Sequence, residues 1–368
     1  MYVRKRVSRG TTPKRQVDRA AAPVCSVRRR QTYGPPRTRS NEKGKDAIPL
    51  NIEEIVKDYV ERAVSMGVQG VVKEFKSVCS YRAPDNLYKY ESFSKNRARN
   101  RYEDVVCLES TRVRLTQDVP PSTDYIHANW VKFEGHDRQF IATQAPLQNT
   151  IDDFWRMVFQ ERCPSVLNLT QTVETDKMKC ILYWPQHAGS FNTYDKMFVN
   201  TKKIEYEEQC AIYTIELLPE GCSDSHIVKL IHMTNWPDKG VPASGRHVLR
   251  LLRMVVANKL DCGPIVVHCS AGVGRTGSII LIDIILRKLF SGERVEMVKL
   301  FKQLRDQRAH AINMPSLYVF VVYSVLDYIR SIPRLRHHRR RSPQVKEETP
   351  DESFVWQRSM AIHMAIDM

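Results

Sequence analysis

The segment around Cys269 limits the possible folds of this chain more than any other part of its sequence. The apolar residues Ile265–Val267 predict a short buried strand, and the apolar run Ser278–Leu289 predicts a helix. Between them lie His268, Cys269 and a turn that contains three glycines. A strand that passes through such a turn directly into a helix indicates an α/β domain.

The same segment has the residues needed to act on a phosphate group. Backbone N–H groups at a helix N-terminus lack partners and carry partial positive charge, so they hold an anion and favour the thiolate form of Cys269. Gly272 and Gly274 let the loop curl so that its N–H groups converge. Arg275, six residues after the cysteine, can donate two hydrogen bonds to phosphate oxygens. Thr276 can donate its hydroxyl to the thiolate when that group leaves.

A simpler reading is a buried structural cysteine beside a glycine-rich helix cap. Of the nine cysteines, however, only Cys269 has an arginine six residues later, and the strand, glycines and helix accompany it. The cysteines are scattered without a C-x-x-C pair, which favours a reducing compartment over disulfides or a zinc site. We expect no metal and no cofactor, because Arg275 and the backbone donors meet the phosphate charge.

Charge and composition divide the chain into three parts. The formal net charge is +16, and residues 1–50 hold 14 Lys and Arg against 3 Asp and Glu, whereas residues 331–368 hold 7 against 5. A segment with few apolar residues cannot offset the entropy of ordering. We therefore expect a basic disordered tail at 1–48, a folded domain at 49–330 and a disordered C-terminal tail at 331–368.

The basic clusters Arg4–Arg6 and Arg28–Arg30 are either solvated or contact an anionic surface or an import factor. Aromatic residues are not interleaved with them as in a nucleic-acid platform, so no specific nucleic acid is expected as a partner. No run reaches about 18 apolar residues, which predicts no transmembrane segment. We expect a cytoplasmic protein, with the nucleus as the alternative location.

The apolar pattern predicts strands mixed with helices. Asn51 begins a possible capping box, and the helix that follows is expected to end near Gly67. Asp152–Glu161 is amphipathic, and Asp153 and Arg156 are expected to be exposed. We predict an α/β fold, with one domain, a twisted mixed β-sheet flanked by helices, and a phosphatase-like strand–loop–helix site for the nucleophile. The other predicted strands are Phe140–Thr143, Val166–Leu169, Ile204–Leu218 and His226–Met233, and the other predicted helices begin near Ala243, Val295 and Pro315.

The run His268–Gly277, HCSAGVGRTG, closely resembles the signature of the tyrosine-specific protein phosphatase family, here of the non-receptor type. The resemblance covers roughly residues 70–330. It implies a metal-independent hydrolase that removes phosphate from tyrosine in signalling proteins through a phosphocysteine intermediate on Cys269. It makes Arg275 and Thr276 catalytic and His268 a supporting residue. The loop residues implied to bind phosphate are Ser270, Ala271, Gly272, Val273 and Gly274.

Two further blocks resemble the family. Asn100–Val105 looks like the loop that recognises phosphotyrosine, which implies that Tyr102 stacks on the substrate ring and that Asp104 accepts peptide N–H groups. Trp236–Asp238 looks like the mobile loop that supplies the general acid, so Asp238 would protonate the leaving tyrosine and then activate water. Trp236 would be the hinge of that loop.

A hairpin of the family is matched by the segment before Cys180. The resemblance implies that Glu174 pairs with Arg275 and orients it. It also implies that Lys179 lies near Asp238, although plain surface charges are the alternative for both.

Four residues depart from the family pattern. Asn313 and Leu317 stand where the family has two glutamines, and the shorter amide of Asn313 is expected to slow hydrolysis of the phosphoenzyme. Lys239 replaces an aromatic residue or histidine, which predicts a preference for acidic residues beside the phosphotyrosine. His127 replaces the usual asparagine of the block Asp124–Asn129, and we interpret it as a structural adjustment.

Two alternatives to an active tyrosine phosphatase stay open. One is a module that binds phosphotyrosine but turns over slowly because of Asn313, Leu317 and Lys239. The other is a C-x5-R enzyme acting on phosphoserine, phosphoinositides or RNA 5′-phosphates, which the apolar Ala271 and Val273 disfavour.

Overall fold

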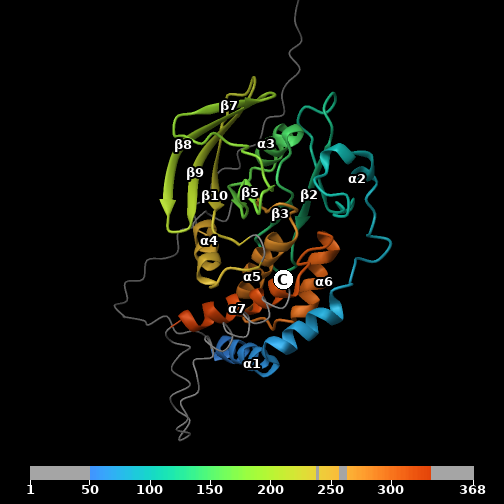
Figure 1. Cartoon of the computed structure of the whole chain (residues 1–368), viewed down its shortest axis with the longest axis vertical. Coiled ribbons are helices and arrows are strands. Elements are labelled where there is room, and N and C mark those ends of the chain that lie inside the picture. Colours follow the sequence, from blue (N-terminus) through green and yellow to red (C-terminus); the bar gives the residue numbers. More distant parts are fainter. Residues whose placement is uncertain (1–49, 238–239, 257–262, 333–368) are drawn as a thin grey trace, which may run out of the picture. The chain divides into compact units, whose positions relative to one another are not determined.

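The computed structural model describes residues 50–237, 240–256 and 263–332 (Figure 1). The predicted tail at 1–48 lies outside these residues, as does the predicted C-terminal tail beyond Ile332. Asp238 and Lys239 also lie outside them.

A mixed sheet forms the centre of the described part of the chain, where it has nine strands in the order β1-β2-β3-β11-β4-β10-β9-β8-β7. The four central strands β3, β11, β4 and β10 run parallel, and the outer neighbours pair antiparallel. The strands are β1 (Arg112–Arg114), β2 (Tyr125–Val131), β3 (Phe140–Thr143), β4 (Ser165–Asn168), β7 (Phe191–Tyr194), β8 (Met197–Glu207), β9 (Cys210–Pro219), β10 (His226–Met233) and β11 (Ile265–His268), with a separate hairpin of β5 (Val173–Glu174) and β6 (Lys177–Met178).

Helices cover both faces of the sheet (Figure 1). Helices α1 and α4–α7 share one apolar core with the sheet, and α3 shares the core on the opposite face. Among the described helices, none is long and apolar enough to cross a membrane. The helices are α1 (Leu50–Val78), α2 (Glu91–Lys95), α3 (Ile151–Gln160), α4 (Arg246–Val256), α5 (Gly274–Phe290), α6 (Met297–Gln307) and α7 (Pro315–Ser331), and single 3-10 turns lie at Arg97–Arg99 and Gln148–Thr150.

Strand β11 lies at the centre because it is apolar on both faces. Ile265 and Val267 contact the core that α5 shares, whereas Val266 contacts the core of α3. Each such side chain stabilises the fold by roughly 1.5–3 kcal/mol when it is fully buried. Because β11 is parallel to both neighbours, the loop after His268 emerges at the carboxyl edge of the parallel strands, where α/β sheets bind ligands.

The predicted fold class is confirmed, and two local predictions are wrong. The segment Ile204–Leu218 is not one strand: β8 and β9 pair antiparallel, with Glu207 opposite Cys210 and a turn at Glu208 and Gln209. The β-branched pattern continues through both strands, so only this polar turn separates them. The helix α1 does break near its predicted end, because Gly67 has non-helical backbone angles.

The predicted exposure of Asp153 and Arg156 on α3 is also wrong, since both are buried. Asp153 accepts hydrogen bonds from Arg99 and, at 2.7 Å, from Arg156. Arg156 also donates to the carbonyl oxygens of Gln117 at 2.7 Å and Thr123 at 3.1 Å. The polar side of α3 is therefore covered by other chain segments, which a helical pattern alone does not reveal.

We expect Asp153→Ala to lower the free energy of unfolding by about 3–5 kcal/mol, because it leaves the buried Arg156 without its carboxylate. Urea unfolding measures the change. Glu205→Ala is the control, since it breaks only the exposed pair with Lys203, and we expect no measurable change there. Equal small effects of both substitutions would contradict a buried ion network at α3.

Candidate active site

Cys269 follows β11 directly, and only 5% of its surface is exposed. The Thr276 hydroxyl donates a hydrogen bond to its Sγ at 3.4 Å. Helix α5 begins at Gly274, so the residues between Cys269 and the helix form a short loop, the phosphate loop (residues 269–274). A thiol that accepts a hydroxyl hydrogen bond at the start of a helix is well placed to carry negative charge.

The carbonyl groups around the phosphate loop are turned outward by donors elsewhere in the chain. Arg308 donates to the oxygens of Ala271 and Gly272, each at 3.0 Å. Backbone N–H groups hold three further carbonyl oxygens. The Leu169 N–H donates to the oxygen of His268 at 2.9 Å, and the Ala145 N–H donates to that of Ser270 at 3.0 Å. The Ile312 N–H donates to the oxygen of Val273 at 3.1 Å.

The N–H groups of residues 270–273 donate no hydrogen bond within the described part of the chain. With the carbonyl oxygens held away, these donors form a concave set of partial positive charges that suits an oxyanion.

Gly272 cannot be replaced without loss of this loop geometry. Its φ is +70°, in the left-handed region that favours glycine. A Cβ atom added to it would lie 2.0 Å from the carbonyl oxygen of Thr143. The glycine therefore allows the phosphate loop to press against the end of β3.

Arg275 is held by Glu174 through two parallel hydrogen bonds of 2.7 and 2.8 Å. This is the pairing that the sequence implied. Glu174 is itself fixed by the Thr170 hydroxyl at 2.8 Å and the Gln171 N–H at 3.1 Å. Arg275 also donates to the carbonyl oxygen of Pro237 at 3.1 Å. A planar guanidinium held in this way is preorganised.

His268 lies behind Cys269 and is fully buried. Its Nε2 is 2.6 Å from the hydroxyl of Tyr183. Burial, with a smaller contribution from the nearby charges of His232 and Arg101, lowers the pKa of His268 to about 3. The imidazole is therefore neutral at pH 7 and places no positive charge beside the sulfur.

Tyr102 lies beside the phosphate loop, and its hydroxyl is 2.8 Å from the Ser270 Oγ. Ser270 in turn donates to the carbonyl oxygen of Lys179 at 3.0 Å, so Lys179 adjoins the loop through its backbone. Asp104 is exposed. The recognition block that the sequence indicated is thus brought beside the phosphate loop.

Trp236 is buried, and its indole lies 5.4 Å from the ring of Phe320 in an edge-to-face contact. Its Nε1–H donates to the carbonyl oxygen of Gly240 at 3.3 Å. This contact closes the base of the loop that carries Asp238, which itself lies outside the described residues together with Lys239.

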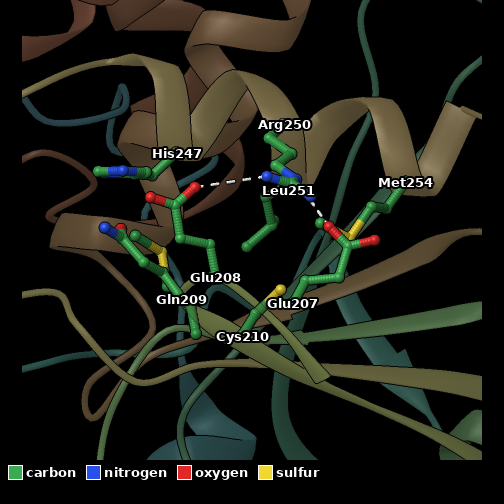
Figure 2. Close-up of a pocket in the computed structure, with 9 residues that line it drawn as sticks. Glu207, Glu208, Gln209, Cys210, His247, Arg250, Leu251 and Met254 are labelled. Atoms are coloured by element: carbon green, nitrogen blue, oxygen red, sulfur yellow. Dashed lines mark hydrogen bonds and ion pairs between the residues drawn. The ribbon is translucent and has the colours of Figure 1, made fainter. Parts of the chain in front are cut away.

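The stem of that loop is held by the β8–β9 turn. The Thr234 N–H donates to the carbonyl oxygen of Gln209 at 3.3 Å, and the Asn235 amide donates to the Gln209 side chain. Figure 2 shows this turn facing α4, where Arg250 points to the carboxylates of Glu207 and Glu208. The hollow between the turn and α4 therefore lies next to the loop stem.

Asn313 is exposed, and its Oδ1 would lie 3.0 Å from a Cβ added to Gly274, at the start of α5. It is therefore beside the phosphate loop. Leu317 is buried and also contacts the space beside Gly274. An aliphatic side chain there cannot hold water by a hydrogen bond.

Arg308 is a part of the site that the sequence did not indicate. It caps the C-terminus of α6 and is 1% exposed. An arginine at the end of an amphipathic helix is usually solvated, so only the three-dimensional structure reveals its contacts with the phosphate loop. Among the described residues, no cluster of three or more His, Cys, Asp or Glu side chains could hold a metal ion.

We expect Gly272→Ala to abolish oxyanion binding and to destabilise the fold. Gly189→Ala is a matched control, because Gly189 has φ +79° with no atom within 4 Å of an added Cβ. That control isolates the cost of the left-handed backbone, roughly 1–2 kcal/mol. Urea unfolding and calorimetric titration with tungstate measure both effects. If Gly272→Ala were no less stable than Gly189→Ala and still bound tungstate, the close approach of the loop to Thr143 would be contradicted.

Comparison with known proteins agrees with this geometry. Residues 96–327 match the family model described as protein-tyrosine phosphatase. Receptor-type tyrosine-protein phosphatase F of Bos taurus is 33% identical over 287 residues, which cover 77% of this chain and 15% of that protein. Tyrosine-protein phosphatase Lar-like of Caenorhabditis elegans is 33% identical over 288 residues, which cover 77% and 13%.

Tyrosine-protein phosphatase non-receptor type 20 of Mus musculus is 30% identical over 264 residues, which cover 71% of this chain and 61% of that protein. This chain therefore spans only part of each of these relatives, and a small part of the receptor-type ones. The matched residues include the phosphate loop, Arg275 and Tyr102. The chain belongs to the protein-tyrosine phosphatase family.

Proposed function

We propose that this chain hydrolyses phosphotyrosine in proteins through a phosphocysteine on Cys269. The observation that carries the proposal is the convergence of three features on one point. The nearly buried Sγ of Cys269 lies at the end of β11. The N–H groups of residues 270–273 follow it and donate no hydrogen bond to any described residue, and two hydrogen bonds to Glu174 fix the plane of the Arg275 guanidinium.

In the first step the Cys269 thiolate attacks phosphorus. An Sγ–P bond forms while the bond from phosphorus to the tyrosine oxygen breaks. The loop N–H groups and Arg275 stabilise the charge on the three phosphoryl oxygens. Asp238 donates a proton to the departing tyrosine oxygen, because phenolate is a poor leaving group at pH 7. This role for Asp238 rests on the family resemblance.

In the second step water attacks the phosphocysteine and the Sγ–P bond breaks. Asp238, now ionised, accepts a proton from the water, and inorganic phosphate is released. The Thr276 hydroxyl, 3.4 Å from Sγ, stabilises the returning thiolate. Asn313 beside Gly274 is the candidate to orient the water, through its side-chain amide.

Tyr102 supports an aryl phosphate as the substrate. Its ring, fixed by the hydrogen bond to Ser270, would form a wall along a substrate phenyl group. The exposed Asp104 can accept N–H groups of the substrate backbone. A binding module with slow turnover is not favoured, because Cys269, Arg275 and Asp238 are all present and the relatives above bear the name of tyrosine phosphatases.

Three further features of the sequence extend the proposal. We assign the catalytic domain to residues 49–330. The basic residues of the N-terminal tail suit contact with an anionic surface or an import factor, and hence a nuclear location. Lys239, which stands where the family has an aromatic residue or histidine, favours substrates with acidic residues beside the phosphotyrosine.

Turnover of a phosphotyrosine peptide tests the proposal. We expect Cys269→Ser to lower kcat to background, because a hydroxyl is a far weaker nucleophile than a thiolate at neutral pH. Asp238→Ala should lower kcat by about 100-fold to 10,000-fold with little change in KM. Asp224→Ala, in an exposed ion pair with Arg162, is the control and should leave both constants unchanged. Undiminished hydrolysis by Cys269→Ser would refute the proposal.

Rapid-quench kinetics tests the expectation for Asn313. With p-nitrophenyl phosphate we expect a burst of nitrophenol of about one equivalent per enzyme, because hydrolysis of the phosphocysteine is slower than its formation. Asn313→Gln should shrink the burst and raise the steady-state rate by roughly 2–10-fold, an effect of about 0.4–1.4 kcal/mol on the barrier. A wild-type chain without a burst and with a steady-state rate unchanged by Asn313→Gln would count against a slow second step.

A further inference from the structure

The side chain of His127 lies buried between the two loops of the candidate site. It projects from β2 and is 2% exposed. Its Nε2 is 2.7 Å from the carbonyl oxygen of Val105, at the end of the block that carries Tyr102. Its Nδ1 is 3.1 Å from the guanidinium of Arg308. One imidazole thus contacts both the recognition block and the residue that holds the phosphate loop.

The partners of His127 determine which of its nitrogens carries the hydrogen. A guanidinium only donates, so Nδ1 accepts from Arg308; a carbonyl only accepts, so Nε2 donates to Val105. The bond from Arg308 to Nδ1 requires the neutral imidazole, because the charged ring has no acceptor. Burial, with the nearby charge of Arg308, lowers the pKa of His127 to about 3, which keeps it neutral across the physiological range.

Arg308 continues the connection to the phosphate loop. In addition to its bonds to Ala271 and Gly272, it donates to the Asn129 side chain at 2.7 Å. A continuous series of hydrogen bonds therefore runs from Val105 through the imidazole and the guanidinium to the phosphate loop. The imidazole and the guanidinium at its centre are both buried, so water does not readily replace a missing partner there.

The two ends of the recognition block (residues 100–105) are anchored differently. The first end is tied to the segment after β3: the Arg101 side chain donates to the carbonyl oxygens of Ala145 at 3.2 Å and Pro146 at 2.7 Å. The second end is tied to His127 through Val105. Tyr102 and Asp104 lie between these anchors. Loss of the second anchor would loosen the block from the Asp104 side, while Tyr102 would keep only its hydrogen bond to Ser270 and the Arg101 anchor.

We propose that His127 is a positioning residue that sets the recognition block relative to the phosphate loop by bridging Val105 and Arg308. The proposal rests on the proposed function. The phosphate loop keeps Arg308 and three backbone donors when His127 is changed, whereas the second end of the recognition block loses the bond that ties it to β2. Changes at His127 therefore weaken recognition of the phenyl group and peptide more than they weaken oxyanion binding.

Calorimetric titration separates these two effects. In a Cys269→Ser background, which prevents turnover, we expect His127→Phe to weaken binding of a phosphotyrosine peptide by about 10-fold. With Cys269 intact, binding of tungstate should change by less than about 3-fold. Phenylalanine fills the space but forms neither hydrogen bond. His127→Asn keeps one donor and one acceptor on a shorter side chain, so it should recover part of the peptide affinity.

His226→Phe is the matched control. His226 also binds a backbone carbonyl, that of Cys163 at 2.8 Å, but neither loop of the site. It should leave both affinities unchanged. An equal loss of peptide and tungstate binding in His127→Phe, or no loss of either, would overturn the proposal. Should His127→Phe fail to fold, the same comparison of the two affinities is made on His127→Asn and His127→Gln.

The proposed function is tested separately, by turnover of the unmodified chain. If peptide binding depended on His127 but the chain did not hydrolyse the peptide, the proposed function would be refuted and the bridging role of His127 would be supported.

Discussion

The outward-facing carbonyl groups of the phosphate loop are the constraint on which the rest of the site depends. The carbonyl groups of His268 and of residues 270–273 are each bound by a donor from another part of the chain, namely Leu169, Ala145, Ile312 or Arg308. If these oxygens turned inward, they would repel a phosphate. Since the donors come from segments far apart in the sequence, the loop can exist only in the assembled domain.

The sheet explains why these donors meet. Leu169 and Ala145 follow β4 and β3, which flank β11 on either side as parallel neighbours. The continuous apolar run of β11 buries it between two helical layers, and that burial places the end of the strand at the carboxyl edge of the sheet. The position of Cys269 is therefore a consequence of hydrophobic burial, and its chemistry is a consequence of the hydrogen bonds that surround it.

Two largely buried arginines lie at this edge of the sheet, and hydrogen bonds compensate for the loss of their hydration. Arg308 and Arg275 are both largely removed from water, which costs several kcal/mol for each ion in the absence of partners. Arg308 has four hydrogen-bond acceptors, and Arg275 has a carboxylate and two carbonyl groups. Such networks hold side chains in one geometry, which is the property that oxyanion binding requires.

The sequence predicted those features that depend on neighbouring residues. The strand, the glycines, Cys269 and Arg275 are contiguous, so their chemistry can be inferred before the fold is known. Glu174 was indicated only through the family resemblance. Arg308 and the bridging role of His127 were not predicted, because their partners are backbone carbonyls brought near by tertiary structure. The burial of the polar face of α3 was missed for the same reason, because polar residues at helical spacing usually lie on the solvent-exposed face of a helix.

The central claim is that the phosphoryl group is transferred to Cys269. Acid quenching during turnover of a phosphotyrosine peptide, followed by mass spectrometry of the digested protein, tests it most directly. We predict one added phosphoryl group, on the fragment that contains Cys269, and its loss in Cys269→Ser. A phosphoryl group on another residue, or turnover with no phosphorylated fragment even when the quench precedes the first turnover, would contradict the claim.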